Sequence, residues 1–183
     1  MAERLVVRRA QPGDAAALVA LAEEVASEPE GWLISAGAWR TPGEERRFLR
    51  ALRRHSDAAV FVAEVSEDIG TELVLSPSAS NRVVGRMSLG RDPHPASRHV
   101  ADLGLMVAAS HRRRGIGKAL LEEAVDWARS SGVRKLELHV FPHNKGAIAL
   151  YEGFGFRREG LRRDHYRRGP AYLDAILMAF EVD

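Results

Sequence analysis

The sequence of 183 residues contains no cysteine. This absence excludes a disulfide framework, a thiolate nucleophile and a cysteine-ligated metal site. No apolar run approaches the roughly 20 residues that span a bilayer. Residues 1–9 lack the long apolar core of a signal peptide. We therefore expect a soluble, cytoplasmic protein without a membrane partner.

A large excess of one charge is also missing. The chain has 27 lysine and arginine residues against 25 aspartate and glutamate residues, so its formal net charge is only +2. Nucleic-acid binding depends on neutralising many phosphates, and such a small excess argues against it. The hydrophobic fraction of 45% is ordinary for a globular protein, and the length favours a single domain over residues 1–183.

The apolar periodicity predicts an alternation of strands and helices. Strands are expected at residues 5–8, 59–65, 82–89, 100–107, 136–141, 156–165 and 172–181. Helices are expected at residues 15–26, 41–54, 118–129 and 144–152. We expect the side chains of Asp14 and Thr41 to cap the first two helices. Residues 66–81 form a turn-rich insertion of unassigned role.

The loop between the strand at 100–107 and the following helix is the most informative segment. It reads Arg112-Arg-Arg-Gly115-Ile-Gly117 and is followed by Lys118. Backbone N–H groups converge at such a helix start, and the helix dipole favours negative charge there. The two glycines allow phosphate oxygens to approach the backbone, and the basic side chains add positive charge. The loop is therefore expected to bind a pyrophosphate.

Two other glycine-rich motifs fail at specific positions. A dinucleotide fingerprint needs a third glycine, and position 120 is Leu. A P-loop needs Ser or Thr after Gly117-Lys118, where Ala119 stands, and it also needs an earlier glycine that is missing. These two nucleotide-binding classes are therefore excluded.

The loop and a second motif together resemble the GCN5-related N-acetyltransferase (GNAT) superfamily. The family's Arg/Gln-x-x-Gly-x-Gly/Ala loop is matched at Arg112, Gly115 and Gly117. Its Asn-x-x-Ala-x-x-x-Tyr-x-x-x-Gly-Phe signature is matched over residues 144–156. The resemblance covers about residues 82–182. It implies an α/β (α+β) fold with a mixed, mostly antiparallel sheet of about seven strands and about four helices, splayed between the fourth and fifth strands.

The resemblance also implies acetyl-CoA as co-substrate and no metal. The pantetheine arm would run along the strand that ends at Val107, and a backbone N–H near Val107 would polarise the thioester carbonyl. His94, His99, His111 and His143 lack the spacing of metal ligands. The expected cofactor-binding residues are Leu105, Met106, Val107, Arg112, Arg113, Arg114, Gly115, Ile116, Gly117, Lys118 and Asn144.

Three residues are candidates for the chemistry. Tyr151 matches the family position that gives a proton or a hydrogen bond to the leaving thiolate, although a tyrosine at this spacing can also be a core residue. His139 lies five residues before Asn144, where ribosomal-protein alanine acetyltransferases have a glutamate. Histidine can act as a base near neutral pH, but strand alternation leaves its direction open. Asp102 is the other candidate base.

The acceptor is less well specified. Trp32 and Trp39 either fill the core or bind the substrate, and the pocket is favoured for one of them because they lie in the irregular segment where this family builds its substrate wall. The C-terminal half is similar to enzymes that acetylate free amino acids or related small amines, and residues 144–156 resemble the ribosomal-protein enzymes. We expect direct attack by a small primary amine in a ternary complex. A peptide N-terminus is the second hypothesis, and a non-catalytic acyl-CoA sensor is the third. Family members often dimerise through their last strands, so a homodimer is a further expectation.

Overall fold

The computed structural model describes residues 3–34, 39–67 and 82–183, so most of the predicted insertion lies outside the described residues. The strands are β1 (Glu3–Arg9), β2 (Ala58–Glu67), β3 (Arg82–Arg91), β4 (Val100–Val107), β5 (Lys135–Val140), β6 (Arg157–Arg168) and β7 (Ala171–Glu181). The α-helices are α1 (Ala15–Ala26), α2 (Pro42–Leu52), α3 (Ile116–Ser131) and α4 (Lys145–Phe154). The expected number and order of strands and helices are confirmed.

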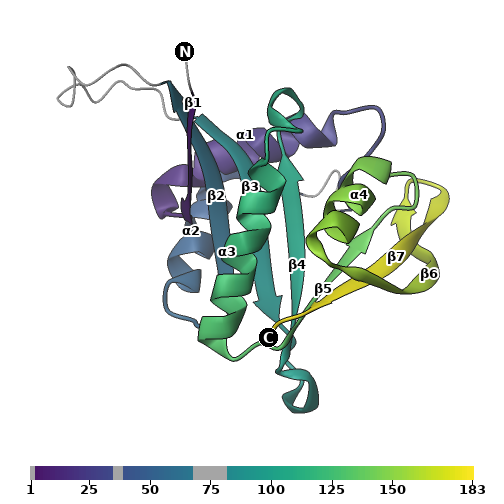
Figure 1. Ribbon diagram of the computed structural model, residues 1–183. Coiled ribbons are helices and arrows are strands. Elements are labelled where there is room, and N and C mark those ends of the chain that lie inside the picture. The colour runs from purple at the N-terminus through teal and green to yellow at the C-terminus, as the bar shows by residue number, and fades with distance from the viewer. Residues whose placement is uncertain (1–2, 35–38, 68–81) are drawn as a thin grey trace.

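The strands form a single sheet in the order β1-β2-β3-β4-β5-β7-β6. All neighbouring pairs are antiparallel except β4 and β5, which run parallel. These two pair only at Val100–Lys135, Ala101–Leu136 and Asp102–Glu137. Beyond these positions they diverge, as Figure 1 shows. The predicted splay between the fourth and fifth strands is therefore confirmed.

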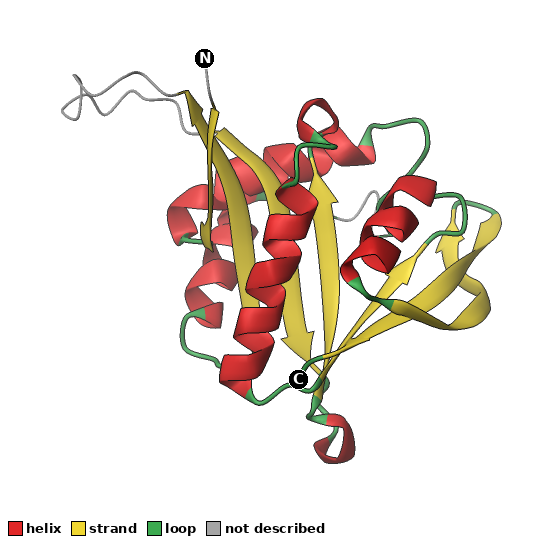
Figure 2. Ribbon diagram, viewed as in Figure 1, coloured by secondary structure: helices red, strands yellow, loops and turns green. Residues whose placement is uncertain are grey.

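Helices cover both faces of the sheet. The Cα of Gly85 on β3 faces Ile116 and Leu120 of α3. The next residue, Arg86, points to the opposite face and reaches Glu45 of α2. Figure 2 shows α1 and α2 behind the sheet, with α3 and α4 in front of it. Among the described residues, no helix combines the length and the apolar character needed to cross a membrane.

The two predicted helix caps have different outcomes. Thr41 caps α2 as expected, since its hydroxyl accepts from the Glu44 N–H at 3.4 Å. Asp14 also precedes α1, but its carboxylate makes no cap bond to that helix. Instead it accepts from the Gln11 N–H at 2.7 Å and from Arg8 at 2.8 Å. The prediction that the Asp14 side chain caps α1 was therefore wrong, because its carboxylate oxygens accept from the Arg8 guanidinium and from the backbone N–H before the 3-10 turn.

Candidate active site

One edge of β4 is open beyond the third residue of the strand. β4 pairs with β3 as far as Val107 but with β5 only as far as Asp102. The Ala108 N–H donates to the Val84 carbonyl of β3 at 2.8 Å. By strand alternation, the backbone groups of Met106 also face β3, whereas those of Leu105 and Val107 face the gap. A ligand that carries amide groups can therefore pair with Leu105 and Val107 but not with Met106.

The loop after β4 forms an anion-binding geometry. Arg113 and Gly115 both have positive φ, 63° and 81°, and α3 begins at Ile116. The Ala119 N–H donates to the Gly115 carbonyl at 3.0 Å. The N–H groups of residues 116–118 precede this bond and have no partner within the helix. They point to the helix start, where the dipole favours an anion.

The two glycines of the loop lie in different steric surroundings. A Cβ at Gly115 would meet nothing within 4 Å, so this position faces open space. A Cβ at Gly117 would lie 2.7 Å from Cδ2 of Leu150 on α4. Gly117 therefore lies where α3 packs closely against α4, and a side chain there would make the Leu150 side chain move. Arg113, Arg114 and Lys118 are exposed around the helix start.

Arg112 uses its guanidinium within the protein. Its Nε donates to the Val107 carbonyl at 3.0 Å. Its two Nη atoms form a forked ion pair with the Glu28 carboxylate at 2.7 and 2.5 Å. The sequence predicted a cofactor contact for Arg112, but in this structure its side chain joins the end of β4 to the segment after α1.

Asn144 precedes α4 and Tyr151 lies on it, beside the open part of β4. The Asn144 side chain caps the helix by accepting from the Ala147 N–H at 3.1 Å. Tyr151 is only 5% exposed, and its ring packs against Phe156 with centroids 5.6 Å apart. Burial raises the pKa of Tyr151 well above its ordinary value. The phenol therefore stays protonated at neutral pH and can donate a hydrogen bond.

His139 is half-buried on β5, on the face opposite α3. Its Nδ1 lies 2.6 Å from the hydroxyl of Tyr166 on β6. Its Nε2 is buried and has no hydrogen-bond partner among the described residues. Burial, followed by the charges of Arg162 and His165, lowers the pKa of His139. The imidazole is therefore held neutral near pH 7, with one ring nitrogen that lacks a hydrogen-bond partner among the described residues.

An aromatic row extends from this histidine along the same face. Phe141 lies 6.1 Å from Tyr166 and stacks on His143 at 5.3 Å, between ring centroids. His143 in turn stacks on Trp32 at 5.6 Å. Trp32 thus belongs to a wall that continues from His139, whereas sequence reasoning left its position open.

Asp102 lies where β4 and β5 still pair. Its register partner is Glu137. Desolvation raises the pKa of Asp102, and the charges of Glu137 and Asp92 raise it further. Asp102 and Val107 are five residues apart, about 16 Å along an extended strand. A group held at Val107 is therefore out of reach of this carboxyl.

Trp39 belongs to a buried charged cluster that the sequence did not predict. Glu45 is 0% exposed and Arg86 is 3% exposed. Glu45 Oε1 accepts from Arg86 Nη1 at 2.9 Å, and the guanidinium lies 4.8 Å from the Trp39 ring centroid. The Trp39 Nε1 is buried without a partner among the described residues. The only available signal was that Glu45 shares a helical face with Leu49.

The comparison with protein families decides the class of the chain. The profile of the Acetyltransferase (GNAT) family matches residues 20–156, which include β4, the loop, α3 and α4. The chain belongs to the GNAT family.

Two characterised relatives match part of this GNAT chain. The L-amino acid N-acetyltransferase AaaT of Escherichia coli K12 is 36% identical over 101 residues, 53% of this chain and 60% of that protein. The ribosomal protein bS18 alanine N-acetyltransferase of Salmonella typhimurium LT2 is 40% identical over 78 residues, 43% of this chain and 53% of that protein. The chain thus spans little more than half the length of these relatives.

A solved structure is similar over nearly the whole GNAT chain. The acetyltransferase yncA of Salmonella typhimurium, solved with its cofactor acetyl-CoA, superposes with a TM-score of 0.77. The match covers 98% of this chain and 94% of that one at 20% sequence identity. At this identity the likeness shows the fold.

The GNAT structure brings some predicted residues together and separates others. One gap in the sheet is surrounded by the open edge of β4, the loop, Asn144 and Tyr151. His139 lies on the opposite face of the sheet from α3. Trp32 lies in the aromatic row, whereas Trp39 lies in the buried charged cluster. Sequence reasoning missed Tyr166 and Glu28, because each acts through a partner far away in sequence. Among the described residues, no group of His, Asp and Glu is placed to hold a metal.

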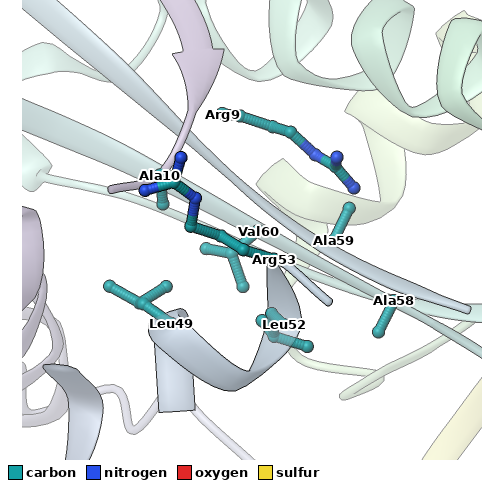
Figure 3. A pocket seen from close by; sticks show the side chains of 8 residues that line it. All are labelled: Arg9, Ala10, Leu49, Leu52, Arg53, Ala58, Ala59 and Val60. Carbon is teal, nitrogen blue, oxygen red and sulfur yellow. The ribbon is translucent and has the colours of Figure 1, made fainter. Parts of the chain in front are cut away.

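A surface hollow lies away from this site. Figure 3 shows it beside the first residues of β2, whereas the loop follows the last residues of β4. Its lining carries two arginines and otherwise small or aliphatic side chains: Arg9, Ala10, Leu49, Leu52, Arg53, Ala58, Ala59 and Val60. None of these residues is a candidate acid, base or nucleophile for acyl transfer.

Proposed function

We propose that this chain transfers the acetyl group of acetyl-CoA to the primary amine of a small molecule, an amino acid or a related amine, by direct attack in a ternary complex. One observation carries the proposal. The unpaired edge of β4 leads directly into a loop whose free N–H groups stand at the start of α3. This continuous line of donors fits a molecule with amide groups at one end and a pyrophosphate at the other.

The cofactor would use the two parts of this line differently. Leu105 and Val107 would pair with the pantetheine arm, while the N–H groups of residues 115–118 would hold the pyrophosphate. The exposed side chains of Arg113, Arg114 and Lys118 would add long-range attraction, and Asn144 would approach the arm from α4. Met106 and Arg112 would support these residues, since their own polar groups are used within the protein.

The chemistry needs a polarised carbonyl and a stabilised leaving group. One backbone N–H near Val107, that of Leu105 or of Val107, would donate to the oxyanion, a contribution of about 3 kcal/mol in other acyl-transfer enzymes. As the amine nitrogen bonds to the carbonyl carbon, the carbon–sulfur bond breaks and the thiolate leaves. The buried Tyr151 hydroxyl would donate to this sulfur. Because its pKa is raised, it acts chiefly as a hydrogen-bond donor.

The attacking amine must first lose a proton. His139 Nε2 is the proposed acceptor, because it is buried, unpartnered and on a neutral ring. For Nε2 to accept, the proton of the neutral ring must sit on Nδ1 and be donated to the Tyr166 oxygen. Tyr166 would thus set the tautomer. Asp102 would then attract the substrate ammonium rather than act as the base.

The segment after α1, which contains Trp32, favours a small amine as the acceptor. Arg168 of β6 donates to the carbonyls of Gly31 and Leu33 at 2.9 and 2.6 Å. These bonds tie the segment after α1 to the last hairpin, which also carries Tyr166, the partner of His139. A peptide N-terminus needs a longer passage and remains the second hypothesis. Location in the cytoplasm, a single domain and a homodimer also remain proposals.

A competition experiment tests the acceptor class. The protein is incubated with acetyl-CoA and a mixture of possible acceptors. The mixture contains free amino acids, polyamines and short peptides with different N-termini, and mass spectrometry identifies the acetylated products. Acetylation of one class of small amine is expected. Acetylation of peptides alone would contradict that choice and favour the second hypothesis. Binding of acetyl-CoA without any product would favour the sensor.

A further inference from the structure

The Glu28 carboxylate connects the acceptor wall to the cofactor loop. We define the acceptor-wall segment as residues 28–33. Glu28 is mostly buried, with 15% of its side chain exposed. Its Oε1 accepts from Arg112 Nη2 at 2.5 Å. Its Oε2 accepts from Arg112 Nη1 at 2.7 Å and from Trp32 Nε1 at 2.9 Å. One carboxylate thus fixes both an aromatic side chain of the wall and the arginine that starts the loop motif.

Arg112 is fixed from its other side by the end of β4. Its Nε donates to the Val107 carbonyl, whose residue also borders the gap. The next residue, Arg113, has the positive φ that begins the anion-binding turn. Because a guanidinium is planar and rigid, its three bonds fix the end of β4, the loop and Glu28 relative to one another.

A contact of Arg112 with phosphate would break this arrangement. The guanidinium would have to leave Glu28, which would strand a mostly buried carboxylate without its partner. Other exposed cations, among them Arg113 and Lys118, already lie beside the helix start. The geometry therefore favours an Arg112 that keeps its bonds when the loop is occupied.

We propose that Glu28 and Arg112 are positioning residues that couple occupation of the pyrophosphate loop to the order of the acceptor-wall segment. The inference rests on the proposed function, because it needs coenzyme A in the loop. A bound pyrophosphate restrains the loop, the loop restrains Arg112, and Glu28 passes the restraint to Trp32. By linkage the coupling is reciprocal, so an ordered wall also tightens the cofactor.

Hydrogen exchange tests the coupling without knowledge of the acceptor. The exchange rates of amides in residues 28–33 are measured by mass spectrometry with and without coenzyme A. The proteins are the unmodified chain, Glu28→Gln, Arg112→Gln and the matched control Glu30→Gln. Glu30 lies in the same segment, and its side chain is exposed. Calorimetry gives the Kd of coenzyme A for each protein, and a melting curve shows that each is folded.

The proposal predicts a pattern across these variants. Coenzyme A should slow exchange of the segment by about fivefold or more in the unmodified chain and in Glu30→Gln, as expected for coupled sites. The slowing should fall below about twofold in Glu28→Gln and Arg112→Gln, while the Kd changes by less than about threefold, under 1 kcal/mol.

Three results would overturn the coupling while the proposed function stands. Coenzyme A could bind without slowing exchange in the unmodified chain, a test that needs no variant. Glu28→Gln could keep the full slowing. Arg112→Gln could weaken coenzyme A by about tenfold or more while Glu28→Gln does not, which would make Arg112 a phosphate ligand. If coenzyme A does not bind the unmodified chain, the proposed function fails and this inference fails with it.

Discussion

The hydroxyl of Tyr166 lies 2.6 Å from Nδ1 of His139, although the two residues are 27 positions apart in the sequence. Because β7 lies between their strands in the sheet, only the folded hairpin brings them together. The contact leaves Nε2 as the nitrogen that can meet a substrate. The proposed base and its acid–base state therefore depend on a residue that no motif marks.

The pH profile of acetyl transfer should report His139. Only the neutral imidazole can accept a proton, and burial lowers its pKa below the ordinary value of about 6.5. We expect kcat/KM to be full above this value and to fall as the pH drops through the lowered pKa. His139→Gln should remove this acidic limb and lower kcat/KM by about 10²-fold.

Tyr166→Phe and His99→Gln complete this test. Tyr166→Phe keeps the aromatic ring but removes the hydroxyl that contacts His139 Nδ1. The acidic limb of the profile should therefore shift to a different pH. The fold-change in kcat should be larger than the fold-change in KM. His99 is an exposed histidine away from the cluster, and its replacement should leave the profile unchanged. If His139→Gln retains the acidic limb, another group is the base.

Folding stability should follow the same titration. The pKa of His139 is lowered in the folded protein, so the unfolded chain binds this proton more readily. Its contribution to stability is therefore present above about pH 6.5 and is lost as the pH falls below that value. Denaturant unfolding at pH 7.5 and 5.5 should show a smaller loss for His139→Gln than for the unmodified chain. An equal loss in both proteins would contradict the shift.

Gly117→Ala should destabilise the protein through packing. The new Cβ would lie 2.7 Å from Cδ2 of Leu150, the end of a flexible side chain that can move, so we expect a loss of at most about 1 kcal/mol in the free energy of unfolding. Combining it with Leu150→Ala should cost less than the sum of the two single changes, as measured by a double-mutant cycle. Strict additivity would show that the two residues do not interact.

The buried pair of Glu45 and Arg86 should be sensitive to single changes. Glu45→Gln leaves the guanidinium uncompensated, and we expect a loss of about 3–5 kcal/mol in the free energy of unfolding. Replacing both residues with Met should cost less than either single change. The exposed neighbour Arg46 is the control, and Arg46→Gln should change the free energy of unfolding by less than about 0.5 kcal/mol. A small loss for Glu45→Gln would show that the pair adds little to stability.

Much of the fold could be predicted because its signals are local. The strand at residues 100–107 was placed with its observed limits, and Gly132 and Gly155 end α3 and α4 in the left-handed conformation. The splay followed from the family resemblance, which rests on the loop and on the Asn144–Phe156 signature. These features depend on neighbours within one turn or one strand, so a sequence pattern can encode them.

The side-chain partners could not be predicted because they depend on register and on distant segments. Arg112 matches the family motif, yet its position relative to Glu28 depends on how the segment after α1 packs, 84 residues away. Gly117 belongs to the motif, but the side chain that crowds it, Leu150, lies on another helix. From the sequence alone Glu45 resembles a surface residue, and its burial is explained by its ion pair with Arg86 on β3.

The most direct test of the central claim is thiol release from acetyl-CoA in the presence of amines, comparing the unmodified chain with Tyr151→Phe. A thiol-reactive dye reads the release, and the chain itself adds no background because it has no cysteine. We expect release with a class of small amines. The variant should lower kcat by about 10²-fold without changing the Kd of acetyl-CoA. No release with any amine, or full activity in the variant, would contradict the account.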